Sequence, residues 1–386
     1  MDYNSSLKVD LLGSTGSIGE QAVDVIRKQK AQVASICANI NYKRVEEQAR
    51  EFKPAFCAMF DENAAKQLKL ALADTNIQVL SGAEGICEMV SQSDAQVSLN
   101  AIIGEAGLLP TLEIIKNKKR LALANKESLV VAGDIVMAEA RKNNTEIIPV
   151  DSEHCAIHQC LRSGNKNEVK KLIVTASGGP FFGKKRNELA EVNAQKALAH
   201  PTWSMGAKIT VDSATLMNKG FELIEASHLF GIEIDKITAI VHRESIIHSM
   251  VEYIDNSVIA QMSVPDMRYC IQYGILGGAR VDTVINELDL AQIATLSFYK
   301  PDTENFPLLS LAIHCKKMGG ALPAVLNAAN EAAVDAFLNN KLSFCGISET
   351  VTKAVEHFAY CNKYKTLKEI LEADRTARAY VDTLIG

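Results

Sequence analysis

Short apolar runs alternate with helix-spaced segments over the first 150 residues. Between the runs, apolar positions recur at the spacing of one helical face, as in residues 42–52, and Pro54 disfavours continuation of that helix. Seven runs have the length and composition of buried strands: Leu7–Leu12, Val33–Ala38, Ala55–Phe60, Ile77–Leu80, Gln96–Ile102, Leu121–Ala124 and Glu146–Val150. Because strands that alternate with helices form parallel sheets covered by helices, we predict an α/β fold with a doubly wound sheet.

The pattern changes after Val150. We expect buried strands at Lys171–Ser177 and Lys208–Ser213 and a helix at Ala214–Phe230. Three closely spaced strands should follow, the last two joined by a hairpin at Asp255-Asn256: Lys236–His242, Ile246–Tyr253 and Val258–Ser263. From Phe306 onward the spacing is helical: Phe306–Met318, Pro323–Asn339, Ile347–Tyr360 and Thr366–Ile385. We therefore predict a first domain over 1–150, an α+β domain over 151–276, a linker over 277–304 and a helical bundle over 305–386.

Composition excludes several classes of protein. The chain has 41 Lys and Arg against 46 Asp and Glu, and this net charge of −5 argues against binding to nucleic acid or to an anionic membrane. Nine Cys without a CxxC pair predict neither a disulfide framework nor a zinc knuckle. No apolar run approaches the roughly 18 residues that a membrane span needs, and the start of the chain lacks the features of a secretory signal. We expect a cytoplasmic protein with reduced thiols.

A glycine-rich turn, Gly13-Ser-Thr-Gly-Ser-Ile-Gly19, lies between the first predicted strand and the first predicted helix. Glycines at this spacing permit a tight turn and the close approach of a pyrophosphate to the helix N-terminus. An ordinary turn without a ligand is the alternative. After the second predicted strand no acid precedes Glu46, although an NAD site needs one there for the ribose hydroxyls. This favours NADP, with Lys43 and Arg44 as the nearby cations or, alternatively, as a solvated helix face.

Two polar clusters follow later strands of the predicted sheet. Asn125-Lys126-Glu127-Ser128 opens a helix at the sheet edge where open α/β proteins bind ligands; helix capping by Asn125 with an exposed Lys126 is the alternative. Asp151 and Glu153 alternate along an extended chain, so that both carboxylates can converge on a hard cation such as Mg²⁺ or Mn²⁺. Two solvated acids before a helix would give the same local pattern.

The histidines and cysteines beside this acidic pair suggest a further metal site only weakly. His154 and His158 have the spacing of a zinc motif, but the glutamate of HExxH is missing between them. We therefore assign His158, Cys155 and Cys160 to packing.

A third group of polar residues lies in the second half of the chain. Ser177-Gly-Gly-Pro180 ends a predicted strand in a loop that suits an anion. The loop His200–Gly206 holds the single Trp, Trp203, either as a lid over a ligand or as a packed surface residue. Asn218 and Glu222 share a helical face beside Lys219, a combination that suits a phosphate, with Glu222 as a third metal oxygen.

Together these motifs resemble one family, the 1-deoxy-D-xylulose 5-phosphate reductoisomerases of the non-mevalonate (MEP) isoprenoid pathway. The matching segments stand in the family's order and span nearly the whole chain: GSTGSIG, LANKESLV, PVDSEH, SGGPF, HPTWSMG, ITVDSATLMNKGFE, SVPDMR and LNAANE. The resemblance implies a Rossmann-like NADPH domain, a catalytic domain and a C-terminal helical bundle, in a homodimer.

The resemblance also implies roles for individual residues. Asp151, Glu153 and Glu222 would bind the divalent metal (Mg²⁺ or Mn²⁺, with Co²⁺ as a further candidate), and Lys126 would reach the substrate beside it. The sugar phosphate would be held by Ser152, Ser177, His200, Ser213, Asn218 and Lys219, under the Trp203 loop. NADPH would contact Thr15, Gly16, Ser17, Ile18, Asn41, Asn125, Glu127 and Gly206.

Two segments depart from the family pattern. Asn39 and Ile40 stand where the family has glycine and lysine, so part of the recognition of the 2′-phosphate must come from elsewhere, with Lys43 or Arg44 as candidates. The stretch from His242 to Ser245 replaces a His-Pro-Gln-Ser sequence and has no role that the sequence assigns.

The activity implied by the resemblance is the NADPH- and metal-dependent rearrangement and reduction of 1-deoxy-D-xylulose 5-phosphate to 2-C-methyl-D-erythritol 4-phosphate. Two alternatives remain at this point. One is a metal-independent NADP dehydrogenase of a phosphorylated or aldehyde substrate, which a chelator would not inhibit. The other is a non-catalytic NADPH-sensing regulator, which would not need the three acids.

Overall fold

A computed structural model describes residues 6–203 and 205–386, which divide into two compact units. The first unit comprises the residues up to 128 together with 136–158 and 266–286, and the second comprises 129–135, 159–265 and 287–386. The units interleave along the sequence, because α6 (Glu127–Asn143), with a non-helical Ala132, and α7 (Ser152–Cys160) each contribute residues to both. The predicted domain boundaries at residues 150, 276 and 304 therefore stay a prediction.

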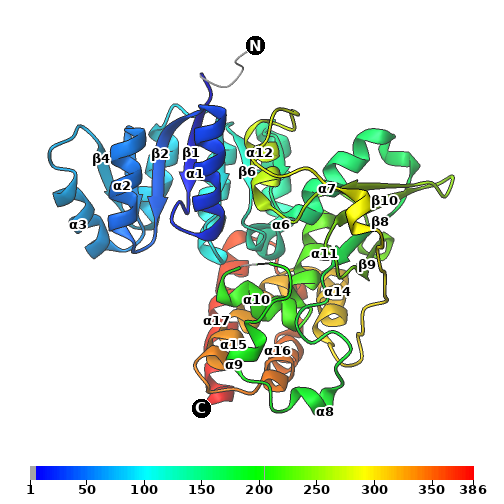
Figure 1. Ribbon diagram of the computed structural model, residues 1–386. Coiled ribbons are helices and arrows are strands. Elements are labelled where there is room, and N and C mark those ends of the chain that lie inside the picture. The colour runs from blue at the N-terminus through cyan, green and yellow to red at the C-terminus, as the bar shows by residue number, and fades with distance from the viewer. Residues whose placement is uncertain (1–5, 204) are drawn as a thin grey trace. The chain divides into compact units, whose positions relative to one another are not determined.

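The first unit is built on a seven-stranded sheet of order β4-β3-β2-β1-β5-β6-β7, in which every neighbouring pair is parallel (Figure 1). The strands are β1 (Lys8–Leu12), β2 (Gln32–Ala38), β3 (Phe56–Met59), β4 (Gln78–Ser81), β5 (Val97–Asn100), β6 (Arg120–Leu123) and β7 (Ile147–Pro149). All seven predicted strands and the α/β fold class are confirmed. The order reverses between β1 and β5, and such a switch point is where open parallel sheets bind ligands.

Helices connect these strands and pack their apolar faces on the sheet. They are α1 (Ser17–Gln29), α2 (Tyr42–Phe52), α3 (Glu62–Ala71), α4 (Gly82–Gln92), α5 (Leu108–Lys116) and, from later in the chain, α12 (Met267–Ile275), with a 3₁₀ turn at Glu105–Gly107. One core cluster joins Leu11 and Ile36 of the sheet to Ile26, Val45 and Ile271 of three helices. The burial of these apolar side chains fixes the helices over the strands whose ends carry the polar motifs.

The second unit contains a four-stranded sheet of order β11-β10-β8-β9. Its strands are β8 (Val169–Ala176), β9 (Ile237–Val241), β10 (Ile247–Tyr253) and β11 (Val258–Met262). β8 and β9 are parallel, whereas β10 pairs antiparallel with β8 and with β11. The predicted hairpin and antiparallel edge are confirmed.

One predicted strand is wrong. Residues 208–213 lie in a helix, α10 (Ala207–Ala214), although their β-branched side chains favour a strand. The hydroxyl of Thr210 donates to a backbone carbonyl one turn earlier at 2.8 Å, and Asp212 accepts a 2.7 Å hydrogen bond from Asn330 of α15. The bond between Asp212 and Asn330 is a tertiary contact, and such contacts override local propensity.

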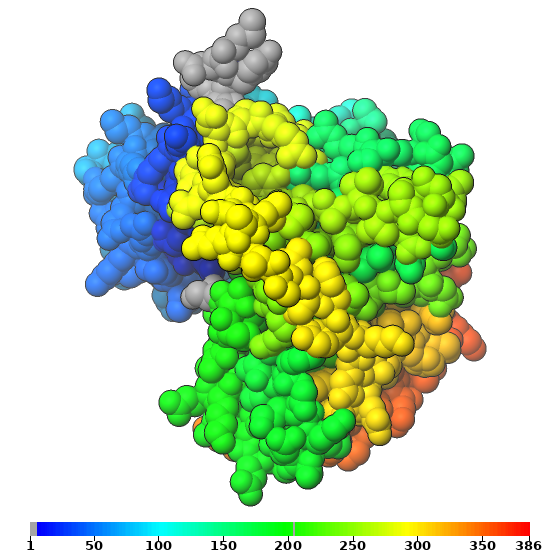
Figure 2. Space-filling model, turned by 45° about the vertical axis from the view of Figure 1, so that its right-hand side comes forward, coloured from blue at the N-terminus to red at the C-terminus, as the bar shows by residue number. Residues whose placement is uncertain are grey.

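The rest of the second unit is mainly helical, as predicted. Its further helices are α8 (Arg186–Leu189), α9 (Ala194–Ala197), α11 (Met217–Phe230), α13 (Leu290–Ile293), α14 (Leu308–Met318), α15 (Leu322–Leu338), α16 (Phe344–His357) and α17 (Leu367–Ile385), with 3₁₀ turns at Leu161–Ser163, Lys166–Glu168, Ile234–Lys236 and Ala359–Lys363. Residues 287–304 run largely exposed along the surface of this unit (Figure 2). Within the described parts of the chain, no helix is both long and apolar enough to cross a bilayer.

Candidate active site

The glycine-rich turn joins β1 to α1 and packs closely against its neighbours. The backbone nitrogens of Gly13 and Ser14 both donate to the carbonyl of Cys37, at the end of β2, at 2.9 Å. Gly13 has φ +80°, and a Cβ there would lie 2.5 Å from the carbonyl oxygen of Ala101. A Cβ on Gly19 would lie 2.3 Å from the carbonyl oxygen of Gly13. Only glycine fits either position, which is the condition for a turn this tight.

This turn fits a dinucleotide pyrophosphate. The hydroxyl of Ser14 is fully buried and has no hydrogen-bond partner among the described residues. Gly16 is the N-cap of α1, and no side chain caps this helix. The helix therefore presents its positive N-terminus where a phosphate would lie. Thr15 and Ile18 are half-buried and Ser17 is exposed on the same turn. An ordinary turn would leave the Ser14 hydroxyl unexplained.

The residues after β2 begin α2. Asn41 is the N-cap of this helix, and its side-chain oxygen accepts a 3.3 Å hydrogen bond from the backbone nitrogen of Arg44. Lys43 lines a hollow between α2 and α3 with Glu46 and Arg50. The guanidinium of Arg44 instead donates to Glu20 of α1. Lys43 and Arg44 therefore lie on different faces of the helix, a difference that the sequence alone did not reveal.

The loop after β6 contains a buried lysine and a structural asparagine. The side-chain nitrogen of Asn125 donates to the carbonyls of Ile102 and Gly104 at 2.7 and 2.8 Å, and its oxygen accepts from the backbone nitrogen of Ser128 at 3.0 Å. Asn125 therefore ties the loop after β5 to the start of α6. Glu127 is also buried, and its carboxylate lies 3.2 Å from the Asn125 side chain. Contact of either residue with a cofactor stays a prediction.

Lys126 and the acids after β7 form one cluster in the first unit. Lys126 is buried, and its ammonium lies 2.7 Å from the Asp151 carboxylate, which excludes the exposed lysine of the capping alternative. Oxygens of Asp151 and Glu153 lie within 4.8 Å of each other, and the hydroxyl of Ser152 donates to Glu153 at 2.5 Å. Two carboxylates this close are suited to sharing a hard cation.

The charge state of Asp151 supports that use. Burial acts to raise its pKa, but the positive charge of Lys126, followed by His154 and a hydrogen bond to Glu153, outweighs burial and holds the pKa well below the ordinary value. The carboxylate is therefore ionised at neutral pH, as a metal ligand must be.

The nearby histidine and cysteines pack in the fold, as the sequence predicted. The Nδ1 atom of His158 lies 2.8 Å from the hydroxyl of Tyr273, and the two rings meet edge to face. Cys155 lies in a small core cluster with Tyr273 and Cys270, and Cys160 is buried as well. His158 is therefore engaged by an aromatic partner of its own unit.

In the second unit, Ser177 follows β8 and meets His200. Its hydroxyl lies 2.9 Å from Nε2 of the histidine, whose Nδ1 accepts from the backbone nitrogens of Thr202 and Trp203 at 3.2 and 2.9 Å. These bonds place the ring proton on Nε2. Burial, and then the charge of Arg243, lowers the pKa of His200 to about 4. His200 is thus a neutral hydrogen-bond donor.

Arg243 lies beside the proposed site, and the sequence reasoning gave it no role. Its guanidinium donates to the carbonyls of Ser177 and Gly179 at 2.6 and 2.8 Å and lies over the ring of Phe182. A Cβ on Gly179, which has φ +65°, would lie 2.8 Å from the carbonyl oxygen of Ser213. Arg243 therefore holds the loop from Ser177 to Gly179, and the absence of a side chain on Gly179 lets that loop pack against Ser213. The only sequence signal was an arginine in a segment that departs from the family pattern.

The start of α11 gathers three of the predicted residues. Asn218 and Lys219 both donate to the Glu222 carboxylate, and Lys219 and Glu222 are almost fully buried. Leu216, just before the helix, has φ +62°, a left-handed conformation that costs a side-chain-bearing residue about 1 kcal/mol. A strained backbone conformation of this kind persists only where the surrounding structure requires it.

Two residues of the predicted loop have less distinctive surroundings. Trp203 is half-buried, and its ring lies 6.2 Å from that of His248. Gly206 is the exposed N-cap of α10, with open space where a Cβ would be. The lid function of Trp203 and the cofactor contact of Gly206 both stay predictions.

Three family profiles match the chain. Residues 9–133 match 1-deoxy-D-xylulose 5-phosphate reductoisomerase, residues 147–230 the C-terminal domain of that enzyme, and residues 262–380 the DXP reductoisomerase C-terminal domain. The 1-deoxy-D-xylulose 5-phosphate reductoisomerase of Clostridium botulinum strain Loch Maree is 47% identical over 377 residues, which cover 97% of this chain and 98% of the relative. The chain belongs to the 1-deoxy-D-xylulose 5-phosphate reductoisomerase family.

Solved structures of this reductoisomerase family agree in fold. The Zymomonas mobilis enzyme, in complex with NADPH, has a TM-score of 0.90 and 41% sequence identity, and the match covers 98% of this chain and 99% of the other. A DOX-P reductoisomerase in complex with NADPH, fosmidomycin and magnesium has a TM-score of 0.94 and 35% identity, with 98% of each chain covered. The predicted family and its Rossmann-like fold are thus confirmed, while the roles assigned to individual residues remain to be tested.

Proposed function

We propose that this chain converts 1-deoxy-D-xylulose 5-phosphate to 2-C-methyl-D-erythritol 4-phosphate with NADPH and a divalent cation. The observation that carries the proposal is the buried Lys126–Asp151 pair with Glu153 beside it, in a chain of this family. This group of residues lies past the carboxyl ends of parallel strands, where such sheets bind ligands. A solved relative is in complex with NADPH and magnesium, the two groups that we propose the glycine-rich turn and this donor set hold.

The proposed metal ligands are Asp151, Glu153 and Glu222. All are carboxylates, the ligand type that Mg²⁺ and Mn²⁺ prefer, and Co²⁺ is accommodated by the same donors. When bound, the cation supplies charge stabilisation at substrate oxygens and NADPH supplies the hydride. In this proposal Lys126 keeps Asp151 ionised and reaches the substrate.

Most residues of the proposed phosphate anchor belong to the second unit. Neutral His200 donates from Nε2, and Lys219 supplies a positive charge. The hydroxyl of Ser177 lies on a loop that Arg243 holds, and the hydroxyl of Ser213 lies on α10, which packs closely against Gly179 of that loop. Asn218, and Ser152 of the first unit, complete the proposed set. Binding a phosphate far from the reacting carbons orients the substrate, which lowers the barrier without touching the bonds that change.

The remaining cofactor contacts are proposed for the turn and for the edges of the sheet: Thr15, Gly16, Ser17, Ile18, Asn41, Asn125, Glu127 and Gly206. The closely packed glycines and the unpaired Ser14 hydroxyl support a bound pyrophosphate. We further propose that the enzyme is cytoplasmic and a homodimer, as the family resemblance implies; sedimentation at micromolar concentration would reveal a monomer if the dimer is wrong.

The deciding experiment follows NADPH absorbance with 1-deoxy-D-xylulose 5-phosphate. Turnover should appear with Mg²⁺ or Mn²⁺, stop on chelation and return when metal is added. Turnover that survives chelation would instead indicate a metal-independent dehydrogenase. NADPH binding without turnover under any condition would indicate a non-catalytic sensor.

The lid proposal has its own test. Trp203→Ala should reduce kcat/KM for the sugar phosphate by roughly tenfold, because loop closure excludes water and completes the site. NADPH affinity, measured by calorimetry, should change little. An unchanged kcat/KM would assign Trp203 to packing against His248.

A further inference from the structure

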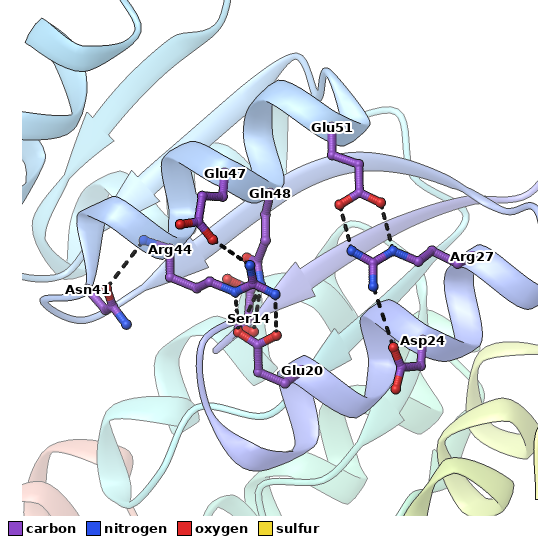
Figure 3. Close-up of polar contacts among 9 residues, drawn as sticks. All are labelled: Ser14, Glu20, Asp24, Arg27, Asn41, Arg44, Glu47, Gln48 and Glu51. Atoms are coloured by element: carbon purple, nitrogen blue, oxygen red, sulfur yellow. Dashed lines mark hydrogen bonds and ion pairs between the residues drawn. The ribbon is translucent and has the colours of Figure 1, made fainter.

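The two cations after β2 have different surroundings. Lys43 lies at the hollow between α2 and α3, whereas Arg44 reaches the first turn of α1 (Figure 3). There Arg44 meets Glu20, which follows the glycine-rich turn directly. Gln48 links the same carboxylate to the turn, because its amide lies 3.3 Å from Glu20 and 3.2 Å from the carbonyl of Ser14. Arg44 is therefore the cation on the side of the pyrophosphate turn.

Arg44 is already held by two carboxylates. Its Nε and Nη2 donate to the two oxygens of Glu20, both at 2.7 Å, and its Nη1 donates to Glu47 at 2.5 Å. One positive and two negative charges give this cluster a net charge of −1. All three side chains retain partial exposure, so a ligand can reach them.

A negative cluster at this position affects the choice of dinucleotide. The adenosine ribose of a bound dinucleotide lies beyond the end of the second strand, where a carboxylate favours a free 2′-hydroxyl and a cation favours a 2′-phosphate. Asn39 carries no charge, and Ile40, which is 66% exposed, offers the phosphate nothing. On the side of α2 that faces the glycine-rich turn, the charges that the phosphate would meet are those of Arg44 and its two partners.

We propose that Glu20 is a specificity-determining residue that engages Arg44 and so weakens the enzyme's preference for NADPH over NADH. This inference rests on the proposed function, because it assumes dinucleotide binding at the turn. A 2′-phosphate must compete with Glu20 for the guanidinium and also approach a cluster of its own sign. NADH makes neither demand, so the chain discriminates between the two less than it would with a free Arg44.

The test is calorimetric binding of NADPH and of NADH to the unchanged chain and to Glu20→Gln. Freeing Arg44 from one carboxylate should tighten NADPH binding by roughly fivefold, the scale of one partly exposed ion pair, and change NADH binding by less than about twofold. The gain should shrink at high salt, because exposed charges are screened. The double variant Glu20→Gln/Arg44→Gln should lose this gain in NADPH affinity.

The chain offers a matched control in the second α1–α2 pair of Figure 3. Glu51 of α2 accepts two 2.7 Å bonds from Arg27 of α1, farther along both helices. Glu51→Gln removes a bidentate pair of the same kind and should leave the NADPH-to-NADH ratio unchanged. Thermal melting of both variants controls for loss of helix packing.

Each other result overturns the inference in a recognisable way. Weaker NADPH binding in Glu20→Gln would mean that Glu20 positions Arg44 for the phosphate. An unchanged ratio, or equal shifts in both variants, would mean that Arg44 does not read the ribose. Failure of the unchanged chain to bind either dinucleotide would overturn the proposed function, and this inference with it.

Discussion

Two buried lysine–aspartate pairs of the first unit differ in what surrounds them. Asp10, in the middle of β1, lies opposite Ser35 of β2 and Ser98 of β5, and both hydroxyls donate to it at 2.7 Å. Ser93 and Lys119 also donate to Asp10, and the Lys119 ammonium uses its other donors on the carbonyls of Val90 and Ser93. Every group of this network is satisfied within the fold.

The Lys126–Asp151 pair lies instead past the end of β7. The Asp151 side chain keeps 13% exposure, whereas Asp10 has none, and Glu153 lies beside it rather than a ring of hydroxyl donors. The charges of the Asp10 network interact only with groups of the fold and hold the strands together. The Lys126–Asp151 pair has a second carboxylate beside it and is partly exposed, so it can still bind a ligand. Burial of charge alone therefore does not identify a site.

The largest expected effect is on the second pair. Asp151→Asn should reduce kcat/KM by about a thousandfold, because a metal ligand and its negative charge are lost together. The free energy of unfolding should fall as well, because buried Lys126 loses its counter-charge, so kcat/KM is compared per folded molecule. NADPH affinity should persist. Turnover near that of the unchanged chain at saturating Mg²⁺ would remove Asp151 from the metal site.

Asp10→Asn should lower stability but not activity. It leaves the buried Lys119 without its counter-charge, which should lower the free energy of unfolding by about 3 kcal/mol in urea titration. Activity per folded molecule should remain within about twofold, since the motif residues are untouched. An inactive but fully stable variant would erase the distinction between the two pairs.

This contrast also explains how much the sequence could predict. Alternating strands and helices, and motifs at strand ends, are local patterns, so the seven-stranded sheet and the position of Asp151 could be predicted. The Asp10 network depends on the register that sets Asp10 against Ser35 and Ser98, and no local pattern records that pairing. The masking of Arg44 by Glu20 is likewise invisible, because it joins residues from different helices.

A pair of histidines carries the comparison into the second unit. The ring of His242 is fully buried: Nε2 accepts from the backbone nitrogens of Ile246 and Ile247, and Nδ1 donates to the carbonyl of Ser297. His200 is less buried and donates to a single hydroxyl of the proposed phosphate anchor. His242, like Asp10, has its polar atoms bonded within the fold, whereas His200, like Asp151, is more exposed and lies in the proposed site.

His200→Gln should therefore raise KM for the sugar phosphate by about tenfold, the loss of one hydrogen bond to a charged group, with little change in melting temperature. The matched variant His242→Gln should leave KM nearly unchanged and destabilise the fold by about 2 kcal/mol. Steady-state kinetics and melting curves measured on both variants test this. A raised KM in His242→Gln together with destabilisation in His200→Gln would exchange the two roles.

The smallest expected effect is an absence of titration. Because the pKa of His200 is lowered from 6.5 to about 4, the ring should stay neutral from pH 8 to about 5.5, and its NMR signals, assigned with His200→Gln, should not move in that range. Between pH 6.5 and 4 the unfolded chain binds a proton that the folded chain refuses. The free energy of unfolding should therefore fall as the pH is lowered from 6.5 to 4, and it should fall by less in His200→Gln. The other histidines contribute equally to both proteins, so the difference between their stability curves isolates His200. An NMR titration midpoint near pH 6.5 would mean that the His200 ring is not desolvated beside Arg243 as the structure has it.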